Sequence, residues 1–497
     1  MLVLGVFFRF ANLERKVYWH DEVYTSLRIS GYTKAEIVQQ VFDGHEIGIE
    51  ALQKYQRFKP GSRLIDTFNS LAVEDSQHPP LYYMILRFWV KWFGNSVTVI
   101  RSLTALISLL IFPCVYWLCL ELFESSVVGW VAILLIAVSP IHVLFAQEAR
   151  EYCLWTVTIL LSSASLLRAM RLKTKSSWGV YAVTVSLGLY TFLFSGLVII
   201  GHATYVFTSE RFKLSKTIAA YFIASLTGLL SFIPWILNII IYRYNIRSTT
   251  DWALRRVPIV SLFKSWLLNS SRIFLEFDDN NLLSYIIFLI TSTLIIYSLY
   301  FICKHSPIRV WLFILTLIGS TALPLILIDV FKGGIMSTVH RYLFPCYLGV
   351  QLAVAYLFFT RITQAISPER KWRLLMAALL SSGVISCIVS FQAETGWTKN
   401  TSNNNPQIAR IINQAVHPLL ISNSAHTNFG NLISLSYLLE PKVRMRLVTE
   451  PNPPQIPDGF SDIFLFAGSS NELRLPPDNV KNYKIEPIFK ELWRLKM

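Results

Sequence analysis

Two neighbouring carboxylates stand among aromatic residues shortly after the first apolar stretch. Asp21 and Glu22 follow Trp19 and His20, and Tyr24 comes two residues later. Adjacent acids in a loop are most often solvated surface residues. Aromatic side chains gather at membrane surfaces, however, and ionisable groups close to the membrane are costly and tend to serve a function. A carboxylate in such a place can take a proton from a hydroxyl group.

A histidine followed by two prolines ends the same loop. The prolines at 79–80 stop the chain from continuing as a helix and fix the direction of the next segment. A rigid corner accounts for the prolines but leaves His78 unexplained. For His78 a ligand-binding role and a structural role are equally favoured.

A polar turn between two apolar stretches contains Gln147, Glu148, Arg150 and Tyr152. A helix cap would account for part of this polarity. Arginine is disfavoured in short loops on the outer side of a membrane, so Arg150 in such a loop indicates an anionic partner.

The segment His340, Arg341 and Tyr342 repeats this pattern at the start of a later apolar stretch. Two arginines that face one cavity make a good clamp for a phosphate or diphosphate. Snorkelling of each arginine to lipid headgroups is the competing explanation. Carboxylates and arginines together are the groups needed to transfer a substituent from a lipid-linked phosphate to a hydroxyl. The sequence has no dinucleotide fingerprint or P-loop, which fits a donor delivered by the membrane.

The elements that must position these residues are membrane spans. Hydrophobic residues make up 53% of the chain and charged residues only 15%, against about 25% charged in soluble proteins. The net charge of +15 lies in short loops rather than in one stripe or tail, which disfavours nucleic acid as a partner. The six cysteines lie in or beside apolar runs without metal or disulfide spacing, as small buried residues do.

Apolar runs predict about eleven spans, near residues 1–13, 97–120, 126–145, 151–170, 178–193, 195–208, 217–242, 281–303, 308–330, 339–360 and 372–391. The first is too short to cross about 30 Å of hydrocarbon. Either this helix is stunted or, as we expect, a turn or two lies upstream of it. The run 178–208 is too long for one span and predicts a hairpin broken near Ser195 and Gly196. Residues 81–93 predict an amphipathic helix lying in the outer interface.

The basic loops then fix the orientation. If the first span runs outward, four basic clusters face the cytoplasm: Arg168/Arg171/Lys173/Lys175, Arg211/Lys213/Lys216, Lys304/Arg309 and Arg361/Arg370/Lys371/Arg373. The segments 14–80, 145–152, 243–280 and 331–342 then share the outer face. We expect a transmembrane domain at 1–391, with outer loops 14–80 and 243–280. Residues 392–497, with short apolar strands at 418–422 and 462–467, predict a small extracytoplasmic α/β domain.

In order and spacing, residues 1–360 resemble the GT-C glycosyltransferases. The matching motifs are Arg9…Asn12-Leu13…Trp19-His20-Asp21-Glu22, His78-Pro79-Pro80-Leu81-Tyr82-Tyr83, Ser139-Pro140…Gln147-Glu148-Ala149-Arg150-Glu151-Tyr152 and Arg341-Tyr342-Leu343-Phe344-Pro345. They are closest to the family 39-like branch, which holds the protein O-mannosyltransferases and the lipid A aminoarabinose transferase. The short first helix and His20 depart from the common pattern.

The resemblance implies a polyprenyl-phosphate-linked sugar donor, a hydroxyl acceptor and inversion at the anomeric carbon. It implies that Asp21 is the catalytic base and that Arg150 and Arg341 contact the lipid phosphate. The candidate substrate-binding residues are Glu22, His78, Tyr82, Gln147, Glu148, Arg150, Tyr152, His340, Arg341 and Tyr342. Members of the family differ over a divalent metal, for which Asp21, Glu22 and His78 are candidate ligands.

A flippase or transporter of lipid-linked sugars is the main alternative, because it too needs arginines for phosphate and aromatic rings for sugar. Inverted repeats and ionisable residues at mid-membrane would favour it, and the sequence shows neither. An assembly protein whose outer tail binds a partner is a third reading. The chain size favours a bacterial inner membrane with the site facing the periplasm. The acceptor stays open among a protein hydroxyl, a lipid headgroup and a glycan.

Overall fold

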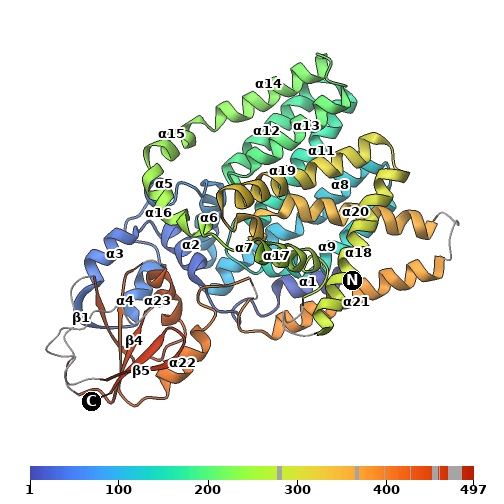
Figure 1. Ribbon diagram of the computed structural model, residues 1–497. Coiled ribbons are helices and arrows are strands. Elements are labelled where there is room, and N and C mark those ends of the chain that lie inside the picture. The colour runs from blue at the N-terminus through green and yellow to red at the C-terminus, as the bar shows by residue number, and fades with distance from the viewer. Residues whose placement is uncertain are drawn as a thin grey trace. The chain divides into compact units, whose positions relative to one another are not determined.

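The computed structural model describes residues 1–276, 282–363, 369–396, 398–425, 427–449, 457, 459–467 and 484–496. The expected outer loop 243–280 and the expected span 281–303 therefore lie partly outside the described residues. The chain divides into two compact units, and Figure 1 labels most of their helices and several of their strands. Unit 1 comprises Met1–Ala11, Asp75–Tyr82 and Arg101–Gln392, and unit 2 comprises Asn12–Glu74, Tyr83–Ile100 and Ala393–Met497.

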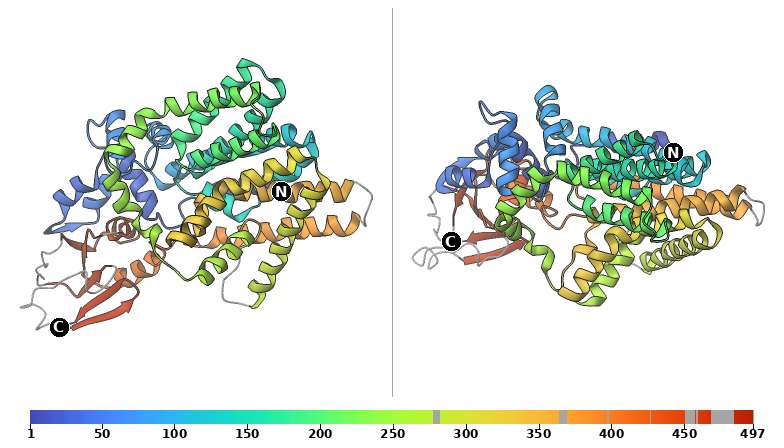
Figure 2. Two further views of the ribbon diagram at one scale, coloured as in Figure 1. Left: turned by 45° about the horizontal axis from the view of Figure 1, so that its top comes forward. Right: turned by 90° about the horizontal axis from the view of Figure 1, so that it is seen from above.

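Unit 1 is helical. Its elements are α1 (Leu2–Phe10), most of α7 (Val97–Leu109), α8 (Ile111–Phe123), α9 (Ser126–Ala137), α10 (Pro140–Ala146), α11 (Tyr152–Leu172), α12 (Lys175–Thr191), α13 (Ser195–Ser209), α14 (Lys216–Ser231), α15 (Ile233–Ile241), α16 (Arg243–Thr250), η2 (Asp251–Leu254), α17 (Ile259–Ser271), α18 (Leu282–His305), α19 (Ile308–Lys332), η3 (Met336–Thr338), η4 (His340–Tyr342), α20 (Phe344–Thr363) and α21 (Glu369–Gln392). Among them α19 packs against α13 and α20, and Figure 2 shows these long helices running along one another.

Six helices in the described part of the chain are long and apolar enough to cross a membrane: Val97–Phe123, Tyr152–Leu172, Ser284–His305, Ile308–Lys332, Phe344–Thr363 and Glu369–Gln392. Two bent pairs raise the number to eight if each is one span. In the first, α9 and α10 meet at 65°, and in the second, α14 and α15 meet at 52°. A proline opens the second helix of each pair, at Pro140 and Pro234, where a continuous helix would lose a hydrogen bond.

The expected count of eleven spans is not confirmed. The other three expected spans correspond to α1, α12 and α13, which have 9, 17 and 15 residues. At about 1.5 Å per residue these helices are short for about 30 Å of hydrocarbon. The predicted break near Ser195 is confirmed: α12 ends at Thr191 and α13 begins at Ser195.

Unit 2 combines helices with one mixed sheet. Its elements are α2 (His20–Ser30), α3 (Lys34–Val41), β1 (Asp43–Gly48), α4 (Glu50–Gln53), η1 (Lys54–Gln56), α5 (Leu64–Glu74), most of α6 (Leu81–Phe93), α22 (Asn405–Asn413), β2 (Pro418–Asn423), α23 (Asn428–Ser436), β3 (Arg444–Val448), β4 (Asp462–Phe466), β5 (Lys484–Phe489) and β6 (Leu492–Lys496). Among the described residues the sheet order is β1-β3-β2-β4-β6-β5. Strands β3, β2 and β4 are parallel, and every residue of central β2 is buried, as such strands require.

The small C-terminal sheet domain expected from the sequence is present, and a strand from the first hundred residues extends it. β1 pairs antiparallel with β3, placing Ile47 beside Met445. One core contains Val23 and Leu27 of α2 together with Leu420 and Phe464 of the sheet. Residues 12–74, which sequence reasoning placed with the transmembrane domain, therefore pack with the C-terminal segment.

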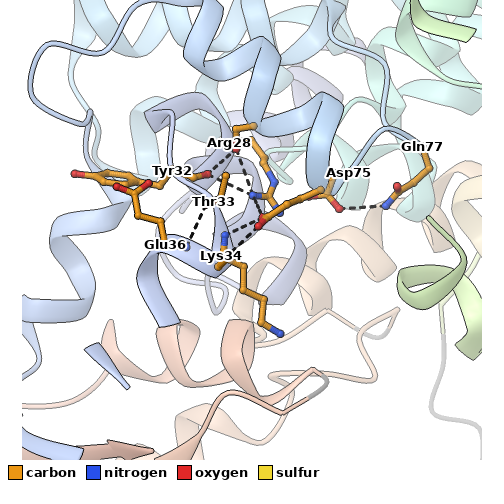
Figure 3. Close-up of polar contacts among 10 residues, drawn as sticks. Arg28, Tyr32, Thr33, Lys34, Glu36, Asp75 and Gln77 are labelled. Carbon is orange, nitrogen blue, oxygen red and sulfur yellow. Dashed lines mark hydrogen bonds and ion pairs between the residues drawn. The ribbon is translucent and has the colours of Figure 1, made fainter. Parts of the chain in front are cut away.

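Buried polar contacts fix the C-terminal end of α2. Arg28 donates to the Glu74 carboxylate and to the Tyr32 carbonyl, at 2.5 and 3.4 Å. The same carboxylate accepts from the backbone N–H of Lys34 at 2.8 Å, while Thr33 caps α3 (Figure 3). The charge of Arg28 is thus balanced, and α2 is held in one orientation relative to α3 and α5.

Candidate active site

The acidic pair lies in the first turn of α2, which follows Trp19 as the N-cap. The carboxylate of Glu22 accepts a hydrogen bond from the backbone N–H of Trp19 at 3.4 Å, as in a capping box. Glu22 is fully buried, whereas Asp21 is only partly buried. The positive end of the helix dipole at the first turn favours both carboxylates. Helix capping therefore accounts for Glu22, and Asp21 is the more accessible acid.

In unit 1, His78 contacts two charged residues of the polar turn. Its Nδ1 lies 2.7 Å from Oε1 of Glu151, a fully buried side chain. Nη2 of Arg150 lies 3.2 Å from Nε2 of His78 and 3.4 Å from the same carboxylate oxygen. Both contacts are satisfied when Nδ1 donates to Glu151 and Nε2 accepts from Arg150. The imidazole is thus oriented by the carboxylate and lies against the guanidinium.

Sequence reasoning did not single out Glu151, although it stands between two residues that it did select. Burial raises the pKa of the Glu151 carboxyl, but the charge of Arg150 and the contacts with His78 outweigh it and lower the pKa to about 2. The carboxylate is therefore ionised at neutral pH. A carboxyl directly beside an arginine, both next to a span, was the signal in the sequence.

We expect Glu151→Gln to destabilise the protein at neutral pH and not at strongly acidic pH. Because the folded-state pKa is lowered from 4.5 to about 2, the charge stabilises the fold above pH 4.5, and this contribution disappears as the pH falls through about 2. A shift of this size corresponds to about 3 kcal/mol. Thermal unfolding in detergent at pH 7 and at pH 3 measures the difference between wild type and variant. An equal difference at both pH values would contradict this origin.

Three other selected residues of unit 1 hold the local structure. The buried hydroxyl of Tyr82 lies 2.7 Å from that of Thr104. Gln147 donates to the backbone carbonyls of Phe8 and Ala11 at 2.7 and 3.0 Å. The backbone carbonyl of Glu148 accepts from Arg150 N–H at 2.8 Å within the turn. The side chains of Tyr82 and Gln147 thus have a positioning role beside the role in substrate binding expected from the sequence, whereas the contact of Glu148 is made by its backbone.

Arg341 lies in η4 and is half-buried. Its guanidinium is 5.5 Å from the ring centres of Trp252 and of Tyr342. The neighbouring His340 places Nδ1 3.3 Å from the hydroxyl of Tyr347. Both rings lie within the distance of a cation–π interaction with this guanidinium.

The two arginine-bearing segments meet in one cluster of aromatic rings. The ring of Phe192 lies 5.7 Å from Tyr152 and 6.1 Å from Tyr342. Arg150 stands over the first of these tyrosines at 5.7 Å, as Arg341 stands over the second. The residues connecting α12 to α13 thus join the two motifs, which are almost 200 positions apart.

A buried arginine fixes the bent helix that leads into the polar turn. Arg9 of α1 donates to the carbonyls of Ile136 and Ala137 at 3.1 and 2.8 Å, where α9 ends, and to Gly5 at 2.7 Å. Only glycine fits at position 5, because a Cβ there would lie 2.5 Å from the Ala137 oxygen. Arg9 thereby satisfies the carbonyl groups that the break in the helix exposes.

We expect Arg9→Leu to destabilise the protein by about 3 kcal/mol, because buried carbonyls would lose their donor. Thermal unfolding in detergent measures this loss. Arg370→Leu, which removes an exposed arginine, is the matched control and should leave the midpoint unchanged. Equal midpoints for both variants would show that Arg9 does not cap the helix break.

The sequence suggested a divalent metal. Within the described parts of the chain, no three His, Cys, Asp or Glu side chains lie together as a group that could bind one. Glu22 serves the helix cap and His78 contacts Glu151. No catalytic step is assigned to a metal.

Comparisons with known proteins point to one fold. Residues 77–237 match the family model described as dolichyl-phosphate-mannose-protein mannosyltransferase. The crystal structure of ArnT from Cupriavidus metallidurans in the apo state is 11% identical, with a TM-score of 0.54, over 99% of this chain and 96% of its own. The same protein bound to undecaprenyl phosphate is 10% identical, with a TM-score of 0.50 and the same coverage. The chain has a GT-C glycosyltransferase fold.

The match of the family model includes His78, Arg150 and Glu151 of the GT-C fold described here, whereas Asp21 and Arg341 lie outside it. The archaeal oligosaccharyltransferase AglB from Archaeoglobus fulgidus, in complex with an inhibitory peptide and a dolichol-phosphate, is 12% identical over 89% of this chain and 64% of its own, with a TM-score of 0.49. A comparison with curated protein sequences gives no match.

Proposed function

We propose that this protein transfers a sugar from a polyprenyl-phosphate donor to a hydroxyl acceptor on the extracytoplasmic face of a bacterial inner membrane. The observation that carries the proposal is the shared aromatic cluster of the Arg150 and Arg341 segments. Two cations held beside aromatic rings suit a phosphate joined to a sugar. A protein of the same fold, ArnT, was solved bound to undecaprenyl phosphate, which supports a donor of this class.

The proposed reaction is a single displacement at the anomeric carbon. Asp21 accepts the proton of the acceptor hydroxyl while the hydroxyl oxygen attacks the anomeric carbon. The bond between the anomeric carbon and the phosphate oxygen breaks, and polyprenyl phosphate leaves. Arg150 and Arg341 stabilise the charge that develops on the leaving phosphate. The displacement inverts the configuration of the sugar.

The arginines at the two ends of α11 and α20 support the proposed location of the site on the extracytoplasmic side. Arg150 precedes α11 and Arg341 precedes α20, whereas Arg171 and Arg361 lie in the last turns of the same helices. At that other end, Arg171 pairs with Glu121 at 2.9 Å. Basic residues concentrate on the cytoplasmic side of membranes. The arginine motifs then begin their helices on the outer side.

Transfer from defined donors tests the function. Purified protein is incubated with radiolabelled polyprenyl-phosphate sugars and membrane fractions, and the labelled product and free polyprenyl phosphate are identified. We expect label in a hydroxyl-linked product with inverted anomeric configuration. Movement of intact lipid-linked sugar across proteoliposomes without release of polyprenyl phosphate would instead identify a flippase.

A further inference from the structure

Residues 393–437 contact the segment that leads into the acidic helix α2. Val17 N–H donates to the Glu394 carbonyl at 2.8 Å, and His20 N–H donates to the Ser402 hydroxyl at 3.2 Å. Both partners come from the part of the chain after the last span. These two hydrogen bonds, at Val17 and at His20, therefore fix the backbone that precedes Asp21.

A buried lysine of the same segment lies beside the N-cap residue. Nζ of Lys399 is 3.6 Å from the ring centre of Trp19, and the two residues are 7% and 6% exposed. A desolvated cation–π contact of this kind is among the stronger ones. The end of α2 that carries Asp21 is thus anchored to Lys399.

Contacts between aromatic rings continue the packing of α2 against the C-terminal segment. The rings of Tyr24 and Phe429 are 5.9 Å apart, and His20 lies 5.0 Å from Tyr24. Gly430 is the neighbour that permits this approach, because a Cβ on it would lie 2.5 Å from Nδ1 of His20 and 2.9 Å from Cε2 of Tyr24. The imidazole of the residue before Asp21 rests directly on the backbone of α23.

We propose that the C-terminal domain, which no comparison assigns a role, is a working part of the transferase that holds Asp21 in position. Gly430 is the main positioning residue and Lys399 the second. The inference rests on the proposed function, since it presumes that Asp21 takes the acceptor proton. A shift of the α2 N-terminus by about 1 Å can reduce a reaction rate about 100-fold, because proton transfer depends on distance and alignment.

Gly430→Ala tests the packing of α2 against α23, because the added methyl group must displace His20. Alanine is the better helix former, so α23 itself is not weakened. We expect kcat for transfer to fall about tenfold or more while KM for the donor stays within about twofold. Gly179→Ala, in a helix where a Cβ meets nothing within 4 Å, is the matched control. Thermal unfolding of each variant records the stability.

A second substitution separates positioning from loss of structure. His20→Ala removes the ring that the new methyl group would strike at 2.5 Å. It also frees the space into which the neighbouring Tyr24 ring, 2.9 Å from the methyl group, can move. We therefore expect the double variant Gly430→Ala/His20→Ala to recover the kcat of His20→Ala alone. Recovery of kcat supports the positioning of Asp21 by α23, since a general folding defect would persist in the double variant.

Two results would overturn the inference: full activity of Gly430→Ala, or a double variant that is as slow as Gly430→Ala. Asp21→Asn is measured beside them to keep the two proposals apart. If Asp21→Asn retains transfer, the assignment of the base fails. If Asp21→Asn is inactive and Gly430→Ala is fully active, only the role of the C-terminal domain fails.

Discussion

Asp21→Asn is expected to reduce the rate of sugar transfer about 10³-fold while donor binding persists. The amide has the size of the carboxyl group and is tolerated in the first turn of a helix. It cannot accept the proton of the acceptor hydroxyl, so the attacking oxygen stays neutral and weakly nucleophilic. Single-turnover transfer from a labelled donor measures the chemical step separately from product release.

Substitutions of two further acids are controls for Asp21→Asn. Asp43→Asn changes an exposed aspartate of β1 in the same unit and should keep the wild-type rate. Glu22→Gln retains an oxygen that can accept from Trp19 N–H, so we expect less than about a tenfold loss if its role is the helix cap. A loss in Glu22→Gln as large as that in Asp21→Asn would move the base to Glu22.

Arg150→Lys should show the second large effect, a fall in kcat of about 10² to 10³-fold. Lysine keeps a positive charge, but it cannot present the planar pair of donors that a phosphate accepts. It also cannot reach His78 and Glu151 with the geometry that the guanidinium has, at 3.2 and 3.4 Å. The loss should therefore appear in kcat, where the leaving phosphate gains charge, more than in KM for the donor.

Arg171→Lys is the control for this substitution, because Arg171 lies at the opposite end of α11 and pairs with Glu121. Its kcat should equal that of the wild type. If Arg150→Lys raised KM for the donor and left kcat unchanged, Arg150 would bind the ground state only, and the role in the departure of phosphate would be wrong.

The helices of the transmembrane part were largely predictable from the sequence, because apolar runs are local signals. The hairpin break before Ser195, the helix at 81–93 and the strands β2 and β4 all lie close to where composition placed them. The number of spans was not predictable, since hydropathy alone does not decide whether helices of 17 and 15 residues, such as α12 and α13, cross the bilayer.

The missed features depend on contacts between distant residues. β1 is a short polar strand whose partner is β3, so nothing in its own sequence marks it as part of the C-terminal sheet. Glu151 was passed over because adjacent acids and bases on a turn look alike until burial distinguishes them. Arg9 was recognised as part of a motif, but the carbonyls it caps appear only once the helix bends at Ala137.

The pairing of β1 with β3 sets an order of events during synthesis. Glu46 of β1 contacts Arg444 of β3, and these residues are 398 positions apart. At a translation rate of about 5–20 residues per second, roughly 20 to 80 s separate their exit from the ribosome. By the end of that interval every candidate span has been made, while the helix that carries Asp21 still lacks its partners in the C-terminal segment. A nascent chain of this protein can therefore occupy the membrane before the segment that packs against α2 has been synthesised.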